Sequence, residues 1–569
     1  MNPAAFRPLR TLAFALPAVL ASTVLFSQTG PDAATGQTAI KAYEDQIGAE
    51  RIRASVQFIS DDLFEGRYPG RRGGELAAKY IATQFALDGL KPAGDNGTWF
   101  QQIEFVGMKA RPAETNMSLV PATGAPIPLA FGDDYTVMNQ TLTPTADVDA
   151  PIVFVGYGAT APEFAWDDYA GIDVKGKVIL CIVGDPPSDD PKFFAGKALT
   201  YYGRWTYKFE QAARMGAVGA LIIHRTDLAS YGWSVVKNSN TSEKTFLRDD
   251  KNPRLPVASW IQLDVAKKLF AAANLDLDAE FAAAGQRGFK AVELPVRLKA
   301  HVSSDVRPFQ SPNVVAILSP ARRPAVDQAV LYTAHYDHLG FVPGPDGAPK
   351  TPGDFIYNGA ADNGTGVGIL LELARVWSQV REPLPHSVLF AAVTAEEQGL
   401  LGSQYLGQNP PIPASQIALD INYDMLLPIG VPLETNVNGA QRTSFFPAVQ
   451  KTANEFSLAI VPDPRPEAGS YYRSDHFSLS RVGIPAFSIE AGTLYAWHDR
   501  PWGVARFQEF EDHDYHNFSD NFRPEWDFAG IAKLTRFGMD LGWQVIHSAA
   551  PIVWNHGDEF EAARLASAR

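Results

Sequence analysis

Cysteine is nearly absent from this chain of 569 residues. The single thiol, Cys181, lies in the apolar run KVILCIVG, so the chain has no second cysteine for an internal disulfide. A lone cysteine within an apolar run of strand type is expected in a core. Stability must therefore come from packing, with a bound metal as a possible further source.

An excess of positive charge is also missing. Lys and Arg number 49 against 63 Asp and Glu, which leaves a formal net charge of −14. This balance argues against a nucleic acid or an anionic membrane as a partner, because both attract basic surfaces. It does not identify a substrate, since many soluble proteins are acidic.

Long hydrophobic runs are missing beyond the N-terminus. Arg7 and Arg10 precede an apolar stretch at 11–26, and Pro17 interrupts that stretch. This pattern is typical of a secretory signal peptide, which we predict at residues 1–27. An uncleaved membrane anchor is the alternative, and a lipid anchor is not expected because no cysteine follows. We therefore expect a periplasmic or secreted bacterial protein.

The length predicts more than one domain, and 46% hydrophobic with 20% charged residues is typical of a soluble globular protein. Residues 40–87 show helical spacing of apolar residues, and residues 100–145 resemble short strands. Residues 147–298 form a compact α/β unit without a cluster of His, Cys or carboxylates, which favours a non-catalytic role. From residue 311 onward, apolar runs alternate with amphipathic helices. This alternation predicts a largely parallel sheet with helices on both faces.

Side chains that bind metals follow several of these apolar runs. The set is His335, Asp337, Asp362, Glu396, Glu397 and Asp424. In an open α/β sheet, ligand sites form beyond the carboxyl ends of the strands, so the topology can bring these residues together. The adjacent carboxylates of Glu396 and Glu397 resist burial unless positive charge holds them. We therefore predict a metal pair, with one glutamate binding it and the other moving protons beside it.

The chemistry of such a cluster is specific. Two divalent ions bridged by one carboxylate neutralise the repulsion and activate a shared hydroxide. Imidazole together with carboxylate suits zinc, with cobalt or manganese as substitutes. In an extended segment residues i and i+2 point to the same side, so Asp337 can orient the ring of His335.

Each of these residues alone also has an ordinary structural interpretation. His335 by itself would be a satisfied histidine at a strand end, and Asp362 a helix N-cap. Glu396 and Glu397 by themselves would be a solvated turn. The order of all the elements together favours the metal site over these alternatives.

The ordered motifs AHYDHLG, NGAADNGTG, TAEEQGLLGS, NYDM and YHNFSDN resemble those of the co-catalytic zinc aminopeptidases. That family also contains glutamate carboxypeptidase and the catalytically dead transferrin receptor. The segment FEGRYPGRRGGELAAKYIATQFALDGLKPAG at 64–94 is similar to the stretch that opens many such enzymes. The segment 147–298 resembles the protease-associated domain, in the pieces GKVILCIVGD and GAVGALII.

The resemblance implies a three-layer α/β/α peptidase domain around a largely parallel mixed sheet. It implies that this domain is discontinuous, at 36–146 plus 299–569, and that a smaller β-rich protease-associated domain is inserted at 147–298. All of the mature chain except a short N-terminal linker is covered by this division.

The resemblance also implies a site with two zinc ions. His335 and Asp424 bind one ion, Glu397 and His516 bind the other, and Asp362 bridges the two. The residues after His516 are Asn and Phe, where the family often has Thr and Pro.

Two further roles are implied. Glu396 binds no metal and acts as the general base, and Asp337 steadies His335. His513 is the alternative to His516 as a ligand. The neighbours Ser474, Asp475 and His476 contain the residue types of a hydrolytic triad, but residues adjacent in sequence cannot adopt triad geometry with one another.

The implied function is an exported di-zinc aminopeptidase that hydrolyses the N-terminal peptide bond of peptides with a metal-bridged hydroxide. Its expected partner is a peptide with a free N-terminus, and its oligomeric state is open. Three alternatives are a carboxypeptidase of the glutamate carboxypeptidase type, a glutaminyl cyclase, and a non-catalytic binding protein.

Overall fold

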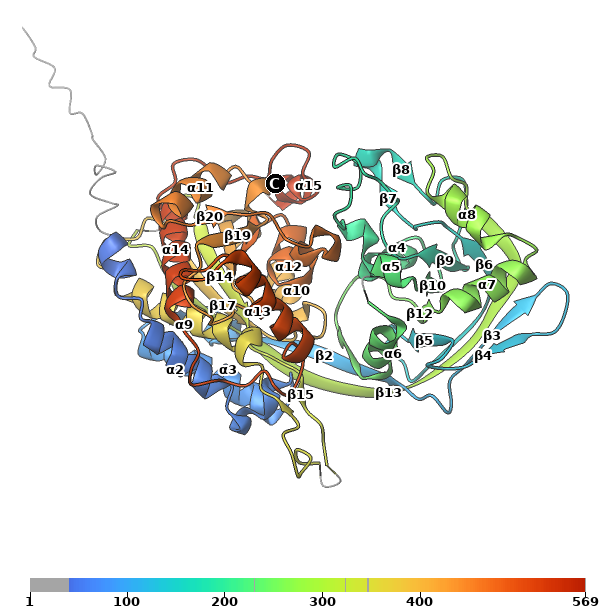
Figure 1. Cartoon of the computed structure of the whole chain (residues 1–569), viewed down its shortest axis with the longest axis horizontal. Coiled ribbons are helices and arrows are strands. Elements are labelled where there is room, and N and C mark those ends of the chain that lie inside the picture. Colours follow the sequence, from blue (N-terminus) through green and yellow to red (C-terminus); the bar gives the residue numbers. More distant parts are fainter. Residues whose placement is uncertain (1–39, 230, 323, 345–346, 568–569) are drawn as a thin grey trace, which may run out of the picture.

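Two lobes, each built around its own sheet, lie side by side and are joined by one long strand (Figure 1). The computed structural model describes residues 40–567, apart from residues 230, 323, 345 and 346. The predicted signal peptide at 1–27 therefore lies outside the described residues. The joining strand, β13 (Val292–Leu318), contributes to both sheets.

The sheet of the first lobe is mixed, with a parallel centre. Its four central strands run in the order β17 (Val388–Val393), β14 (Ala329–His335), β18 (Ile417–Asn422) and β21 (Ala486–Ala491), all parallel. Antiparallel strands flank this centre, namely the second half of β13 beside β17 and β19 (Glu434–Asn438) beside β21. Further strands extend the edges, namely β1 (Lys91–Pro92), β2 (Phe100–Ala110), β11 (Lys244–Leu247) and β20 (Ala459–Ile460).

The central strands form because their sequences are predominantly apolar. Every residue of β14, β17 and β18 is buried. A strand covered on both faces needs apolar residues at every position, whereas a half-exposed strand alternates. The sequence-based prediction of a largely parallel α/β sheet is confirmed.

Helices cover both faces of this sheet (Figure 1). One face packs against α2 (Ala49–Ile59), α3 (Arg72–Leu87), α9 (Thr365–Ser378), α11 (Phe446–Glu455) and α14 (Ala529–Ile546). The other face packs against α10 (Leu401–Gln408) and α12 (His476–Arg481). Two more helices are α13 (Arg500–His513) and α15 (Glu561–Ser567). Within the described residues, no helix combines the length and the hydropathy needed to cross a bilayer.

The second lobe has its own sheet. Four parallel strands form its centre, namely β6 (Thr145–Phe154), β9 (Val178–Ile182), β10 (Gly219–Ile223) and β12 (Val257–Ile261). Antiparallel neighbours are β3 (Asn116–Pro121), β4 (Ile127–Leu129), β5 (Tyr135–Met138) and the first half of β13.

Helices also lie on both faces of this second sheet. One face packs against α7 (Leu263–Ala272) and α8 (Leu277–Ala284), and the other packs against α4 (Trp205–Arg214) and α6 (Trp233–Thr241). The remaining short elements are α5 (Thr226–Ala229), the pair β7 (Thr160–Ala161) with β8 (Trp166–Asp167), and the pair β15 (Gly340–Phe341) with β16 (Ile356–Tyr357).

The second sheet includes chain that precedes the expected boundary at residue 147. Strands β3, β4 and β5 lie before that residue, and residue 147 itself falls inside β6. β3 pairs with β13 and β5 pairs with β12, partners that are distant in sequence, so local patterns do not reveal their lobe. We propose that the inserted unit, still a candidate protease-associated domain, begins near residue 116.

Candidate metal centre

The candidate site lies at the carboxyl edge of the central strands. His335 is the last residue of β14, and it is in register with Val393 at the end of β17. Glu396 and Glu397 follow β17, and Asp424 follows β18 on the other side of β14. Because the three strands are parallel neighbours, residues distant in sequence meet at one edge.

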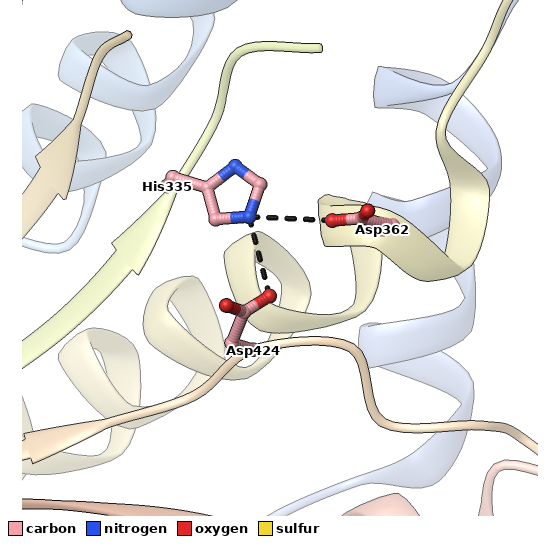
Figure 2. Close-up of side chains that lie close together, drawn as sticks. All are labelled: His335, Asp362 and Asp424. Atoms are coloured by element: carbon pink, nitrogen blue, oxygen red, sulfur yellow. Dashed lines mark hydrogen bonds and ion pairs between the residues drawn. The ribbon is translucent and has the colours of Figure 1, made fainter. Parts of the chain in front are cut away.

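The first group of side chains joins His335, Asp362 and Asp424 (Figure 2). Nε2 of His335 lies 3.3 Å from Oδ1 of Asp362 and 3.2 Å from Oδ1 of Asp424. Asp362 comes from a single π-helical turn, Ala360–Gly364, directly before α9. The three ligand atoms lie within 4.8 Å of one another, which is compact enough to hold one metal ion.

The second group shares Asp362 with the first. It joins His338, Asp362 and Glu397, again with all three ligand atoms within 4.8 Å. His516 also reaches it, with Nε2 at 3.0 Å from Oε2 of Glu397 and 3.3 Å from Oδ2 of Asp362. The two oxygens of Asp362 thus face different groups, which is the geometry of a bridging carboxylate.

Burial and opposite charge compete in this cluster. Burial would raise the pKa of Asp362, but His335 and His516 hold that pKa well below its usual range. Burial also raises the pKa of Glu397, whereas His516 brings it down to about 2. For His516, burial lowers the pKa, and the charge of Glu397 raises it well above the usual value. The carboxylates are therefore ionised where positive charge faces them.

The donor set fits divalent metal ions. Several buried polar atoms have no hydrogen-bond partner among the described residues, namely both ring nitrogens of His338, Oε1 of Glu397 and Oδ2 of Asp337. Nδ1 of His338 is only 2.6 Å from Oε1 of Glu397, but the two atoms lack hydrogen-bond geometry. Buried polar atoms are normally satisfied, and a cation would satisfy these. A mixture of imidazole and carboxylate ligands suits zinc.

Glu396 lies beside the two groups and belongs to neither. Its Oε2 is 3.9 Å from Nε2 of His335, and its backbone N–H donates to Oδ1 of Asp337 at 3.0 Å. Burial raises the pKa of Glu396 well above its usual value, and Glu397 and Asp424 add to this rise against the charge of His335. A carboxyl with a raised pKa can take up a proton at neutral pH.

Asp337 contacts His335 through its main chain. Nδ1 of His335 lies 3.2 Å from the carbonyl oxygen of Asp337, and 3.9 Å from its carboxylate. The carboxylate instead accepts from the N–H of Glu396. Burial raises the pKa of Asp337 to about 7. Asp337 therefore touches both the ring of His335 and the backbone of Glu396, whereas the sequence predicted a carboxylate contact with the ring.

Ser474 supports a site residue and does not form a hydrolytic triad. Its hydroxyl donates to Oδ2 of Asp424 at 2.6 Å and accepts from Nδ2 of Asn422 at 2.7 Å. The neighbouring Asp475 and His476 are buried, and their side-chain atoms have no hydrogen-bond partner among the described residues. The hydroxyl of Ser474 thus orients Asp424.

His516, and not the alternative His513, faces the cluster. His516 has a left-handed backbone with φ of 55°, which turns the chain out of α13 toward Asp362. His513 ends that helix, and its carbonyl accepts from the side chains of Asn517 and Ser519.

Comparison with known proteins places this cluster in a family. Residues 313–535 match Peptidase family M28. The match covers less than half of the chain.

The chain also has curated relatives. Aminopeptidase YwaD of Bacillus subtilis (strain 168) is 35% identical over 220 residues, which are 37% of this chain and 41% of that protein. Leupeptin-inactivating enzyme 1 of Streptomyces exfoliatus is 28% identical over 180 residues, or 30% of this chain and 38% of that protein. The chain thus spans less than half the length of these relatives.

Solved structures are also similar to this chain. An aminopeptidase from Aneurinibacillus sp. strain AM-1 covers 91% of this chain, and 98% of that chain is matched, at 20% identity and a TM-score of 0.49.

The matched segment 313–535 contains every site residue that the sequence predicted, and two contacting residues that it missed. His338 stands in the quoted motif AHYDHLG, one residue after Asp337, so its position was the available signal. Asp520 accepts from the backbone N–H groups of Ala361 and Asp362, at 2.9 and 3.0 Å. Asp520 ends the motif YHNFSD, but no spacing rule connects it with a segment almost 160 positions earlier.

Proposed function

We propose that this chain is an exported metallo-aminopeptidase that holds two zinc ions and hydrolyses the N-terminal peptide bond of peptides. One observation carries the proposal: Asp362 is shared by two compact groups of buried metal-type ligands. The names of the relatives, aminopeptidase YwaD among them, support the reaction class. Peptides with a free N-terminus are the proposed substrates, and no nucleic acid or membrane partner is proposed.

Zinc ions bound in these groups would supply Lewis-acid activation of a water molecule and of the scissile carbonyl. Glu396 takes the proton of that water on its carboxylate and passes it to the leaving amine. Asp337 holds the backbone of Glu396 in place through its hydrogen bond to the N–H. Ser474 holds the carboxylate of Asp424 in place through the hydrogen bond that its hydroxyl donates.

The first test is hydrolysis of aminoacyl anilides with a free amine, compared with their N-acetylated forms. We expect cleavage of the free-amine panel alone, loss of cleavage on chelation, and recovery with added zinc. Cleavage of blocked peptides at a C-terminal residue would favour the carboxypeptidase alternative. Cyclisation of N-terminal glutamine would favour the cyclase.

The variant Glu396→Gln tests the proton-transfer role. The amide keeps the shape of the side chain but cannot accept the proton, so activity should fall by ~10²–10⁴-fold. Zinc content, measured by elemental analysis, should stay at the wild-type level because Glu396 lies in neither ligand group. Turnover close to wild type in this variant would remove Glu396 from the mechanism.

Export by a signal peptide at 1–27 is part of the same proposal. The test is expression of the full chain in a bacterium, followed by fractionation and N-terminal sequencing of the product. A mature N-terminus near residue 28 in the periplasm or the medium would support export. An intact N-terminus in the membrane fraction would favour an uncleaved anchor.

A further inference from the structure

A buried arginine from the N-terminal segment lies directly behind the metal centre. Arg67 is 0% exposed and lies well before residues 313–535, which carry the family match. It ends a short turn, Asp62–Arg67, between α2 and α3. The sequence placed Arg67 in the segment 64–94, which resembles the opening stretch of the zinc aminopeptidases, but gave it no role.

The side chain of Arg67 joins three separate segments. Its Nε donates to the carbonyl of Tyr336 at 2.8 Å, and its Nη2 donates to the carbonyl of Gly359 at 2.8 Å. Its Nη1 donates to the carbonyls of Asn358, at 2.5 Å, and Ile59, at 3.0 Å. Every acceptor is a main-chain oxygen, so the guanidinium fixes backbone rather than side chains.

Two of these segments carry the ligands. Tyr336 stands between His335 and Asp337, and Gly359 stands three residues before Asp362. The rigid, planar guanidinium of Arg67 therefore sets the distance between the backbone that carries His335 and the backbone that carries Asp362. A lysine has a single ammonium on a flexible stem and cannot reproduce this geometry.

The backbone conformation around Arg67 directs its side chain into the core. Gly66 and Arg67 both have left-handed φ angles, of 66° and 52°. A Cβ at Gly66 would lie 2.1 Å from the carbonyl oxygen of Gly340 and 2.6 Å from that of Tyr357, so only glycine fits against β15 and β16. A left-handed conformation is strained for a non-glycine residue and persists only where surrounding contacts fix it.

We propose that Arg67 is a positioning residue of the metal centre, which makes the N-terminal segment a functional part of the M28 site. This inference rests on the proposed function. It assigns to Arg67 the spacing between the backbone that carries His335 and the backbone that carries Asp362, and with it the affinity of the site for metal ions.

The test compares Arg67→Lys with wild-type protein, using zinc titration, the absorption spectrum of the cobalt-substituted protein, and kinetics. We expect zinc affinity to fall by ~10–100-fold, as is typical when a partner that orients ligands is removed. The cobalt bands should shift in position or intensity because the ligand geometry changes. kcat should fall while KM stays within a few-fold of wild type, because Arg67 contacts no substrate.

Arg536→Lys is the matched control. Arg536 also donates to two main-chain carbonyls, of Glu44 at 3.1 Å and Ile47 at 2.8 Å, and so ties the same N-terminal segment to α14 away from the ligands. Arg536→Lys should lower the melting temperature without changing zinc affinity or the cobalt spectrum. Equal zinc affinity and an unchanged cobalt spectrum in Arg67→Lys, with only a lower melting temperature, would overturn the inference.

A measurement on the wild-type protein covers the case in which Arg67→Lys does not fold. Removal of zinc should raise hydrogen exchange in 59–68 together with 335–338 and 358–362, because coupling between sites is reciprocal. Loosening of the two ligand segments without any change in 59–68 would overturn the inference. Wild-type protein that neither binds zinc nor cleaves a free-amine peptide would instead refute the proposed function.

Discussion

At the scale of single residues, the site brings together charges that repel one another in isolation. Glu396 and Glu397 are adjacent in sequence, yet their pKa values move in opposite directions, upward for Glu396 and downward for Glu397. The difference comes from their neighbours, since Glu397 faces His516 at 3.0 Å and Glu396 lies 3.9 Å from its nearest imidazole nitrogen. The surroundings of the two side chains thus give Glu397 the low pKa that suits a metal ligand and Glu396 the raised pKa that suits a proton carrier.

The shared position of Asp362 leads to a test by metal content. Asp362→Ala should lose both zinc equivalents after dialysis at nanomolar free zinc, because both ligand groups contain this residue. Glu397→Ala removes a ligand of the second group only and should retain about one equivalent. Elemental analysis of the two variants, with circular dichroism as a check on folding, makes the comparison. Two zinc ions retained in Asp362→Ala would refute the bridge.

Five of the candidate metal ligands were predicted from the sequence because they form an ordered set of motifs. His335, Asp362, Glu397, Asp424 and His516 converge in the structure. His338 was missed because it stands beside two other candidate residues in one motif and spacing alone does not rank it. Arg67 was missed because its role is to bind main-chain carbonyls, which leave no mark in the sequence.

At the scale of elements, the strands that hold the site were predictable and the strands of the second lobe were less so. β14, β17 and β18 are predominantly apolar because helices cover both of their faces. β3 is short and partly exposed, and its partner is the first half of β13, nearly 180 residues away. Such a pairing depends on tertiary structure that a local window does not contain.

Helix α14 packs closely against the sheet through two glycine residues. A Cβ at Gly542 would lie 1.8 Å from the hydroxyl of Tyr332 on β14, and a Cβ at Gly538 would lie 1.7 Å from the hydroxyl of Tyr423 beyond β18. Both tyrosines are 0% exposed, so they have no open space into which to turn. The two glycines therefore permit the close approach that places α14 behind the site.

Gly542→Ala should accordingly destabilise the protein by ~1–3 kcal/mol through overpacking. The sign of the change in unfolding free energy is informative, because replacing glycine by alanine in a helix with free space would stabilise the protein by roughly 1 kcal/mol. Gly48→Ala controls for the added methyl group alone, since Gly48 is the extended N-cap before α2 and its Cβ would have its nearest contact at 3.6 Å. Urea unfolding of both variants measures the difference, and a stabilised Gly542→Ala would contradict this packing.

At the scale of the whole molecule, the N-terminal segment packs against helix α14, near the other end of the chain. Glu44 is 2% exposed and lies near Asp540 of α14. Burial, together with the charge of Asp540, raises the pKa of Glu44 from 4.5 to about 8. Because the folded state holds this proton more tightly than the unfolded chain, Glu44 favours folding at low pH. That contribution is complete below about pH 4.5 and is lost as the pH rises through about 8.

Glu44→Gln should therefore remove a pH-dependent part of the stability. The amide is neutral at every pH, so the variant should gain stability relative to wild type at pH 9, and this advantage should shrink toward pH 5. Urea unfolding at both values, with the exposed Glu50→Gln as the control, tests this. A difference between wild type and Glu44→Gln that does not vary with pH would show that Glu44 ionises normally.

The long strand β13 places the two lobes under a common constraint. Its first half pairs with β6 and β3, and its second half pairs with β2 and β17, with no break in the chain between them. Loss of one residue near Ser304 would shift one half by a single position and turn its inward side chains outward. Evolution can therefore lengthen or shorten the surface loops of either lobe freely, whereas this strand must keep its length for both cores to persist.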